Sequence, residues 1–298
     1  MELKLKKYNP FNLDHTLNCG QVFRWEKCGE WWEGVVNGVL IRLKQDKNSL
    51  FFHTYPHSIN HEFLVNYFRL DDDLSEILSL IDRDDGIKEA IRAHHGLRLI
   101  RQDPWECLIS YIIATNSNIP AIKRRIKALA ERFGDEIIFD EKTFHVFPEP
   151  SVVAKATPDE LKKCGVGYRV KYLLETAKMI SDDPDLLEEL KKPGYEELRE
   201  ELLKLPGVGY KVADCVSLFA FNKLKAFPVD LWVRRVMYQN YLREEIPINP
   251  ETGKEKPLTR SEYDMLRAFA WDHFGEYAGY AQEYLFYYKR NEQAMVSK

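Results

Sequence analysis

A lysine after a glycine-containing turn is the first candidate for chemistry in this 298-residue sequence. Lys211 follows Gly207 and Gly209, which allow a tight turn into a new helix at about Tyr210. Free amides and the helix dipole at such a start favour an anion such as phosphate. The same dipole and partial burial disfavour the protonated amine, so we expect a lowered pKa and a nucleophile near neutral pH. Amine chemistry on a nucleic-acid backbone is one interpretation; a surface lysine after a Pro-Gly turn is the other.

Asp230 is the second candidate, in the segment Pro228-Val229-Asp230 that lies downstream of Lys211. It is placed like an N-cap before a helix that starts at Leu231, and an N-cap aspartate alone stabilises a helix by about 1 kcal/mol. Capping amides are expected to keep its pKa low, which favours an electrostatic role over that of a strong base. The two roles are compatible.

The elements that must position these residues are predicted to be a small sheet followed by helices. Residues 20–56 have strand character, with Asn37-Gly38 as a two-residue hairpin signal between 31–36 and 39–43, and a third strand at 50–55. From about residue 60 the pattern is helical to the C-terminus. The fold class is therefore α+β, dominated by helices.

Helix starts are marked by specific residues along the second part of the chain. Asp103-Pro104 and Ile119-Pro120 each open a helix, since proline is tolerated in the first turn. Thr157 and Glu160 form a capping box around Pro158. The acidic stretch 181–202 is predicted to be a solvated helical surface.

Composition limits the function classes. No apolar run is long enough for a transmembrane helix, and no secretory signal follows the N-terminal charges. An odd number of dispersed cysteines, without a Cys-x-x-Cys pair, indicates reduced thiols in an intracellular protein and argues against zinc or iron–sulfur sites. They are Cys19, Cys28, Cys107, Cys164 and Cys215.

The net charge of −4 argues against a simple nucleic-acid binder, but its distribution is uneven. Residues 98–132 carry seven Lys/Arg against three Asp/Glu, and 203–241 carry six against two, whereas 181–202 carry nine acidic against three basic. The positive excess lies on the segments with the candidate chemistry, which weakly favours steering of an anionic partner.

Several motifs, in order, resemble a known family. Leu205-Pro206-Gly207-Val208-Gly209-Tyr210-Lys211-Val212-Ala213-Asp214-Cys215 with Pro228-Val229-Asp230 resembles the helix-hairpin-helix and Gly/Pro-Asp signature of DNA glycosylases, and is similar to the eukaryotic-type branch of 8-oxoguanine DNA glycosylase/AP lyases. The resemblance covers most of the chain. It extends to Cys19–Trp25, Arg101–Leu108, Asn116–Ile119, Gly167–Arg169 and Tyr277–Gln282.

This resemblance implies an N-terminal antiparallel twisted sheet domain on a two-lobed helical body, with the active site between the lobes. We predict a sheet domain with flanking helices at 1–97 and a helical glycosylase domain at 98–298. The helix-hairpin-helix is expected at about 195–221.

The implied reaction is excision of 8-oxoguanine from duplex DNA, followed by strand cleavage. Lys211 would attack C1′ of a flipped nucleotide and form a Schiff base, and β-elimination would follow; Asp230 would stabilise the positive charge that develops on the sugar. No cofactor or catalytic metal is expected.

Base recognition is carried over residue by residue. The carbonyl of Gly20 would accept from the N7–H that 8-oxoguanine has and guanine lacks. Gln282 would contact the Watson–Crick edge, while Phe286, four residues later on the same helix face, and Cys215 would stack on the two faces of the base. For Phe286 and Cys215 the alternative is ordinary core packing.

Contacts with the DNA backbone and the opposite strand are also implied. Asn116 would fill the space left by the flipped nucleotide, and Tyr168 and Arg169 would serve as wedge and partner of the opposite base. Phosphate would be held by the amides of Gly207, Gly209 and Val212, and a structural cation by the carbonyls of Leu203, Leu205 and Val208.

Two positions depart from the eukaryotic pattern. Ala121 stands where relatives have an arginine that reads the opposite cytosine, and Trp232 stands where they have a histidine. Because Arg169 alone would supply the bidentate contact, we expect a relaxed opposite-base preference.

Other classes fit less well. An endonuclease III-like enzyme usually has a C-terminal four-cysteine cluster, whereas no cysteine follows Cys215 in this sequence. A monofunctional alkylation-type glycosylase needs no nucleophilic lysine, so Lys211 counts against it. A DNA-binding protein without catalysis is the alternative from another class. We expect a monomer that acts on double-stranded DNA containing 8-oxoguanine, without a membrane, in the cytoplasmic nucleoid if the source is prokaryotic.

Overall fold

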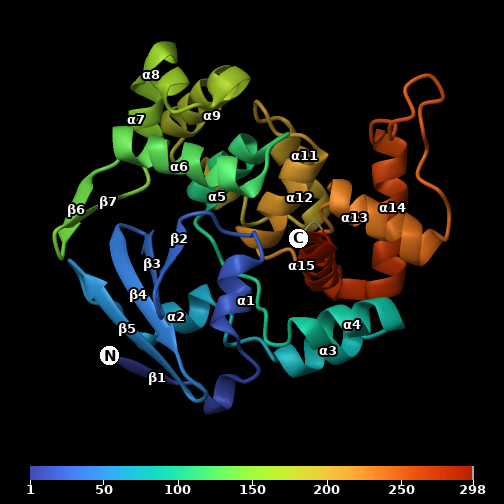
Figure 1. Ribbon diagram of the computed structural model, residues 1–298. Coiled ribbons are helices and arrows are strands. Elements are labelled where there is room, and N and C mark those ends of the chain that lie inside the picture. The colour runs from blue at the N-terminus through green and yellow to red at the C-terminus, as the bar shows by residue number, and fades with distance from the viewer. Residues whose placement is uncertain (297–298) are drawn as a thin grey trace.

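The computed structural model describes residues 1–296 and begins with a five-stranded antiparallel sheet (Figure 1). The sheet order is β1-β5-β4-β3-β2. The strands are β1 (Glu2–Lys4), β2 (Trp25–Cys28), β3 (Trp31–Val36), β4 (Val39–Gln45) and β5 (Ser49–Tyr55). Asn37 and Gly38 both have positive φ, 48° and 76°, as a two-residue hairpin turn requires, so the predicted hairpin is confirmed.

Helices make up most of the rest of the chain. They are α1 (Leu13–Asn18), α2 (His61–Tyr67), α3 (Leu74–Ile81), α4 (Asp85–Ala93), α5 (Pro104–Ala114), α6 (Ile119–Phe133), α7 (Pro150–Lys155), α8 (Pro158–Lys163), α9 (Val170–Asp182), α10 (Leu186–Glu189), α11 (Tyr195–Leu203), α12 (Tyr210–Phe219), α13 (Leu231–Val236), α14 (Arg260–Phe274) and α15 (Ala278–Val296). The side chains of Asp103 and Thr157 cap α5 and α8 as predicted. None of these helices, within residues 1–296, is long and apolar enough to cross a bilayer.

The prediction that the chain stays helical after residue 60 is wrong in one place. Strands β6 (Glu136–Phe139) and β7 (Lys142–His145) form a two-stranded antiparallel hairpin. Buried Ile137 of this hairpin packs against Val35 and Leu40 of the main sheet. The strands are four residues each and largely exposed, so their period-2 signal is weak and tertiary packing decides their conformation.

Two hydrophobic cores divide the molecule. The sheet core includes Trp25, Trp32 and Phe52, and a separate core fills the helical body. Helices α3 and α4 belong to the helical core, whereas Ile100 returns to the sheet core. The chain therefore crosses between the two units more than once, and the predicted domain boundary at residue 97 stays a prediction.

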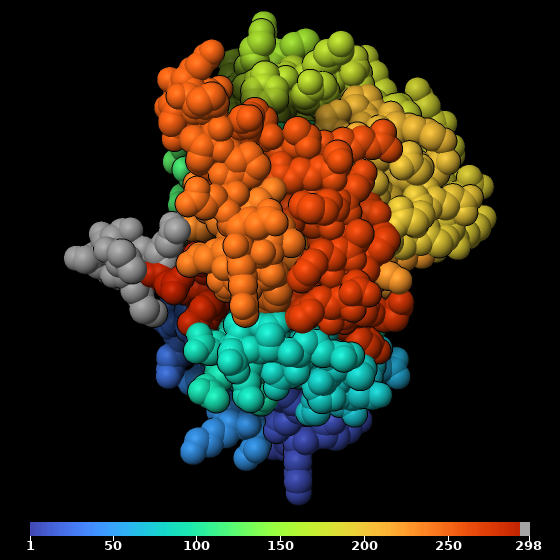
Figure 2. All heavy atoms as spheres, turned by 90° about the vertical axis from the view of Figure 1, so that its right-hand side faces the viewer, coloured from blue at the N-terminus to red at the C-terminus, as the bar shows by residue number. Residues whose placement is uncertain are grey.

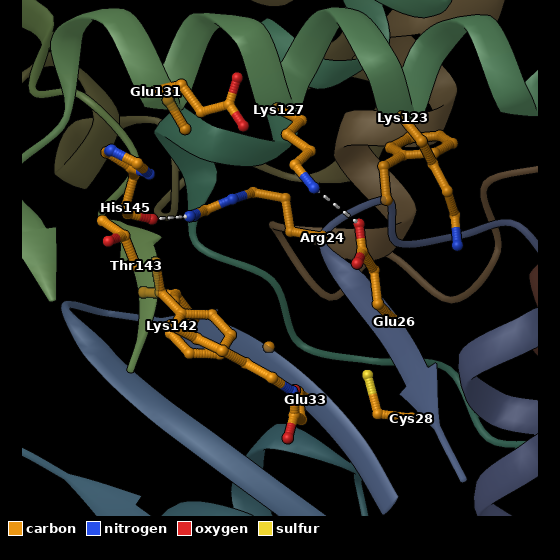
Figure 3. Close-up of a pocket in the computed structure, with 15 residues that line it drawn as sticks. Arg24, Glu26, Cys28, Glu33, Lys123, Lys127, Glu131, Lys142, Thr143 and His145 are labelled. Carbon is orange, nitrogen blue, oxygen red and sulfur yellow. Dashed lines mark hydrogen bonds and ion pairs between the residues drawn. The ribbon is translucent and has the colours of Figure 1, made fainter. Parts of the chain in front are cut away.

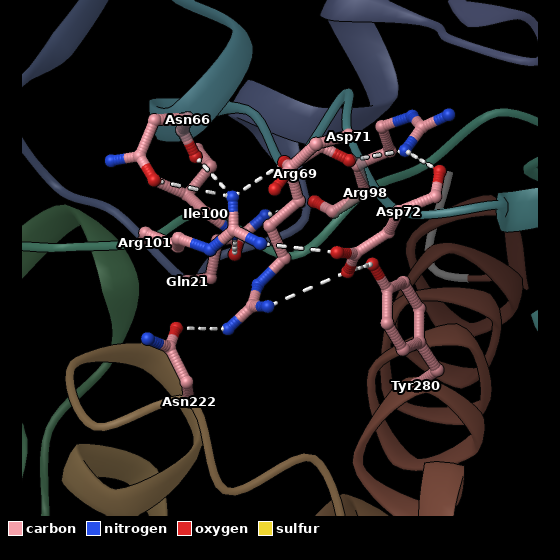
Figure 4. Close-up of polar contacts among 10 residues, drawn as sticks. All are labelled: Gln21, Asn66, Arg69, Asp71, Asp72, Arg98, Ile100, Arg101, Asn222 and Tyr280. Atoms are coloured by element: carbon pink, nitrogen blue, oxygen red, sulfur yellow. Dashed lines mark hydrogen bonds and ion pairs between the residues drawn. The ribbon is translucent and has the colours of Figure 1, made fainter. Parts of the chain in front are cut away.

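A buried polar cluster joins the sheet unit to the helical body (Figure 4). Arg98, 1% exposed, donates to the carbonyls of Tyr8 at 2.8 Å, Pro10 at 3.1 Å and Asp72 at 3.0 Å, and to that of Arg69. An arginine with this many carbonyl partners fixes the segments that carry them, because a buried guanidinium is costly unless it is fully bonded.

Asp72 is the acceptor at the centre of this cluster. Its carboxylate accepts from Arg101 at 3.0 Å, from Arg69 at 3.4 Å and from the Tyr280 hydroxyl at 3.4 Å. Tyr280 lies in the first turn of α15, so the cluster also sets the start of that helix.

Helix α15 occupies the centre of the helical body and packs against α4 and α13 (Figure 1). On the side of the molecule shown in Figure 2, the segments of α13 and α14 lie directly above α3 and α4. This packing gives one face of α15 to a cavity that α5, α6, α12 and the start of α13 also line.

Candidate active site

A cavity of about 320 Å³ contains the predicted catalytic pair. It is lined by Gly20, Phe23, Tyr111, Ala114, Ser117, Asn118, Ile119, Pro120, Ile122, Lys211, Cys215, Phe219, Pro228, Asp230, Trp232, Gln282, Glu283, Phe286 and Arg290. The six residues predicted for catalysis and base binding are therefore together in one space, although they come from distant parts of the sequence.

Lys211 lies in the first turn of α12, and its Nζ is 5.5 Å from the centre of the Tyr111 ring. The expected lowering of its pKa is wrong for the free protein. Burial lowers the pKa of Lys211, but the negative charges that Cys215, Asp230 and Glu283 can carry raise it, and the net direction is upward. The resting side chain is therefore an ammonium ion that must lose a proton before it can attack.

Asp230 caps α13, as predicted. Its Oδ1 accepts from the amides of Trp232 and Val233, both at 2.9 Å. The expected low pKa is wrong, however. Burial raises the pKa of Asp230, and this outweighs the opposing effects of the Lys211 charge and the two amides.

The proposed base-binding residues surround the same cavity. Gly20 has φ of 109°, and a Cβ there would lie 2.7 Å from Arg290 Nη1 and 3.4 Å from Phe286 Cε1. The backbone conformation therefore favours a glycine at this position. Gln282 is 5% exposed, and its Oε1 has no hydrogen-bond partner within the described residues. A buried amide oxygen without a partner is available to a ligand.

Cys215 and Phe286 both face the cavity but differ in exposure. Cys215 is 3% exposed, and burial raises the pKa of its thiol to about 12, so it is an uncharged surface at neutral pH. Phe286 is partly buried and has its ring 5.5 Å from the Arg290 guanidinium. Both positions allow contact with a flat ligand between α12 and α15.

The sequence did not single out two charged residues that line the cavity. Glu283 is the neighbour of Gln282, and Arg290 lies four residues after Phe286, so both occupy the cavity side of α15. Arg290 donates to the carbonyls of Cys19 at 2.7 Å and Asn18 at 2.5 Å, which fixes the loop that ends at Gly20. The helical spacing from Phe286 was a signal that could have identified Arg290.

The residues predicted to enter the DNA lie outside the cavity or at its edge. Asn116 is exposed and adopts a left-handed backbone conformation, with φ of 49°. Its amide nitrogen is 3.5 Å from the hydroxyl of Tyr168, which is 58% exposed. These two side chains project from the surface next to one another, as a wedge pair would have to do.

Arg169 does not face the solvent. It is 4% exposed, and its guanidinium donates to the carbonyls of Thr115 and of Val166, the latter at 3.2 Å. Direct contact with an opposite base would require it to leave these carbonyls. Position 121 is an alanine, whose amide is capped by Asn118. The free protein therefore presents no arginine to an opposite base from either of the two predicted positions.

Helices α11 and α12 form the expected helix-hairpin-helix, which spans 195–219. Gly207 has φ of 81° and packs on Tyr172, whereas Gly209 is the exposed residue before α12. Within residues 1–296 the amides of Gly207, Gly209 and Val212 donate to no carbonyl outside regular helix bonds, which leaves them available to an anion. The Leu205 carbonyl, one of the three proposed cation ligands, already accepts from the Val208 amide at 3.1 Å.

A second cavity, of about 420 Å³, lies between α6 and strands β2, β3 and β7 (Figure 3). Its charged groups largely neutralise one another: Lys127 pairs with Glu26 at 3.7 Å and Lys142 with Glu33 at 3.3 Å. Lys211 and Asp230 are not among its lining residues. It is therefore a weaker candidate for the chemistry than the cavity around Lys211.

Comparison with known proteins agrees with this geometry. Residues 2–108 match the family described as "8-oxoguanine DNA glycosylase, N-terminal domain", and residues 109–256 match "HhH-GPD superfamily base excision DNA repair protein". The N-glycosylase/DNA lyase of Saccharomyces cerevisiae is 32% identical over 92% of this chain and 82% of its own length. This chain belongs to the 8-oxoguanine DNA glycosylase family.

Solved structures of the family have the same fold as this glycosylase. The Clostridium acetobutylicum 8-oxoguanine glycosylase/lyase, solved with double-stranded DNA containing cytosine opposite 8-oxoG, has a TM-score of 0.84 and 31% identity, with 98% of each chain covered. MBOgg1, solved with a low-affinity DNA ligand, has a TM-score of 0.85 and 33% identity over 95% of this chain and 93% of its own. The enzyme is accordingly a DNA glycosylase with AP lyase activity, and DNA is its partner.

Proposed function

We propose that this enzyme flips 8-oxoguanine out of duplex DNA, excises it and cleaves the strand, with Lys211 as nucleophile and Asp230 as the stabilising carboxylate. The observation that carries the proposal is the common cavity of Lys211, Asp230 and the unpaired amide oxygen of Gln282. A nucleophile, an anion and a base-reading group in one space are what removal of a flipped nucleotide requires.

The nucleophile acts in two stages. The neutral Lys211 amine attacks C1′ while the bond from C1′ to N9 breaks, and Asp230 stabilises the positive charge on the sugar. The product is a hemiaminal at C1′, whose bond from C1′ to O4′ breaks to open the sugar and form a Schiff base. Loss of a proton from C2′ then expels the 3′ phosphate by β-elimination. No cofactor takes part in these steps.

Base selection is assigned to one carbonyl and one side chain. The Gly20 carbonyl accepts from N7–H of 8-oxoguanine and would face the N7 lone pair of guanine. Gln282 supplies a donor and an acceptor to the Watson–Crick edge, and Cys215 and Phe286 enclose the ring. A mismatch at a buried hydrogen bond discriminates more strongly than a difference in size.

The remaining predicted residues hold the DNA. The amides of Gly207, Gly209 and Val212 bind phosphate, Asn116 and Tyr168 enter the duplex, and Arg169 reaches the opposite strand only after rearrangement. Leu203, Leu205 and Val208 are the proposed carbonyl ligands of a structural cation at the hairpin. The enzyme acts as a monomer inside the cell, in the nucleoid if the source is prokaryotic.

The test is borohydride trapping on a duplex with 8-oxoguanine opposite cytosine. Wild type should give a covalent adduct, and Lys211→Gln should give none while it still binds the duplex, because the substitution removes the amine and keeps the size of most of the side chain. Lys204→Gln, an exposed lysine of the same hairpin, is the matched control and should trap like wild type.

Other results would point to the competing functions. Base release without strand cleavage or adduct would indicate a monofunctional glycosylase. Binding without release, unchanged in Lys211→Gln, would indicate a DNA-binding protein without catalysis.

A further inference from the structure

Glu283 is a buried carboxylate in the active-site cavity to which the proposed reaction assigns no role. It lies in α15 and is 3% exposed, and it lines the cavity together with Lys211 and Asp230. Its Oε1 is inaccessible to solvent and has no hydrogen-bond partner within the described residues. A buried carboxylate oxygen without a partner is costly, so it is expected where it exchanges a proton or meets a ligand.

Lys211 needs a proton acceptor. Its amine is protonated in the free enzyme, because the charges around it hold its pKa above the ordinary value although burial acts in the other direction. Asp230 already has the role of stabilising the charge on the sugar, and its Oδ1 accepts two amides at 2.9 Å. Glu283 lines the same space and has an unused oxygen.

The other groups around Glu283 leave it able to titrate near neutral pH. Burial raises the pKa of Glu283, and the charge of Asp230 acts in the same direction. The Cys19 thiol, the Arg290 guanidinium and Lys211 lower the pKa, and the net value is about 7. Cys19, Cys215 and Tyr111, which also feel its charge, all have pKa values raised by burial and are neutral at pH 7. A carboxyl group with a pKa close to neutrality can both accept and release a proton there, which suits proton transfer.

We propose that Glu283 is the proton acceptor of Lys211. The carboxylate takes one proton from the ammonium, which gives a carboxylic acid and a neutral amine. The amine lone pair then forms the bond to C1′, and the electron pair of the bond to N9 leaves with the base. The departing base, an anion, accepts the proton from Glu283. This inference rests on the proposed role of Lys211.

The test is the pH dependence of single-turnover excision by Glu283→Gln, which keeps the size of the side chain and cannot titrate. The wild-type rate should fall on the acid side of about pH 7, because protonated Glu283 cannot accept a proton. The variant should lose the break near pH 7 and be at least about tenfold slower at pH 7. Its rate should rise with pH as Lys211 deprotonates directly.

Controls separate this role from a structural one. Glu283→Asp, which still titrates, should recover part of the rate and retain an acidic limb. Glu292→Gln, the same change at an exposed position of α15, should behave like wild type. Binding to a duplex with a tetrahydrofuran abasic analogue should change by less than about twofold in each variant.

Three outcomes would overturn the inference. They are a wild-type rate in Glu283→Gln, a uniform loss of rate with the acidic limb unchanged, and a limb in Glu283→Asp no different from that of Glu283→Gln. If Glu283→Gln does not fold, Glu283→Asp is compared with wild type, and the absence of an acidic limb in Glu283→Asp overturns the inference. If Glu283→Gln is normal and Lys211→Gln does not trap, the proposed function stands and only this inference fails.

Discussion

At the residue scale, Lys211 and Asp230 show how burial and charge oppose each other in one cavity. Burial disfavours the charged form of both groups, and each charge favours the charged form of the other. For Asp230 burial is the stronger influence and raises the pKa, whereas for Lys211 the surrounding negative charges are stronger and also raise the pKa. The free enzyme therefore stores the nucleophile in its protonated form.

The two roles of Asp230 can be separated by one substitution. Asp230→Asn keeps the oxygen that caps α13 and removes the charge, so the free energy of unfolding should change by less than about 0.5 kcal/mol. Single-turnover excision should fall at least about a hundredfold, because the charge on the sugar loses its stabilising anion. Asp73→Asn, at the N-cap of α3, is the control and should leave the rate unchanged. Near wild-type excision by Asp230→Asn would mean that Asp230 is only a cap.

At the element scale, helical periodicity gathers the cavity residues of α15. Gln282, Phe286 and Arg290 follow one another at intervals of four, and Glu283 is three residues before Phe286, so all four lie on one side of the helix. The hairpin of α11 and α12 positions the nucleophile. Its turn sets the orientation of the first turn of α12, from which the Lys211 side chain extends.

The turn of the hairpin should tolerate alanine at only one of its two glycines. Gly207→Ala introduces a Cβ at φ of 81° and 2.7 Å from the Cβ of Tyr172, so the free energy of unfolding should fall by about 2 kcal/mol or more. Gly209→Ala meets nothing within 4 Å at φ of −101° and should cost less than about 1 kcal/mol. Urea unfolding of both variants measures the difference. Equal losses would mean that the turn is not held as described.

At the scale of the whole molecule, the cavity exists because two cores are held together. Gly20 comes from the segment between β1 and β2, and Gln282 from the C-terminal helix. The cluster around Asp72 connects these parts. The side-chain amide of Gln21 donates to the carbonyl of Arg98 at 2.8 Å, next to Gly20. Tyr280, which donates to Asp72, lies two residues before Gln282 on α15.

Removal of Asp72 should loosen this connection. Asp72→Ala leaves Arg69 and Arg101 without a shared carboxylate, and we expect the free energy of unfolding to fall by about 3 kcal/mol. Asp71→Ala, which removes a more exposed partner of Arg101, should cost less than about 1 kcal/mol. Denaturation followed by circular dichroism compares the two. An equal effect of both variants would show that the buried cluster does not hold the units together.

The sequence by itself determined the local features and the motif. The hairpin at Asn37-Gly38 and the caps at Asp103, Thr157 and Asp230 depend on neighbouring residues, so their physics is present in a short segment. The order of the family motifs likewise identified the enzyme without any knowledge of distances.

Only the tertiary structure decided the pKa values of the site residues and which of their side chains are accessible. The upward pKa shifts of Lys211 and Asp230, the burial of Arg169 and the unpaired oxygen of Glu283 depend on groups from segments far apart in the chain. The hairpin of β6 and β7 depends in the same way on packing against the main sheet. Burial and charge act through space, and a linear pattern does not contain the distances on which they depend.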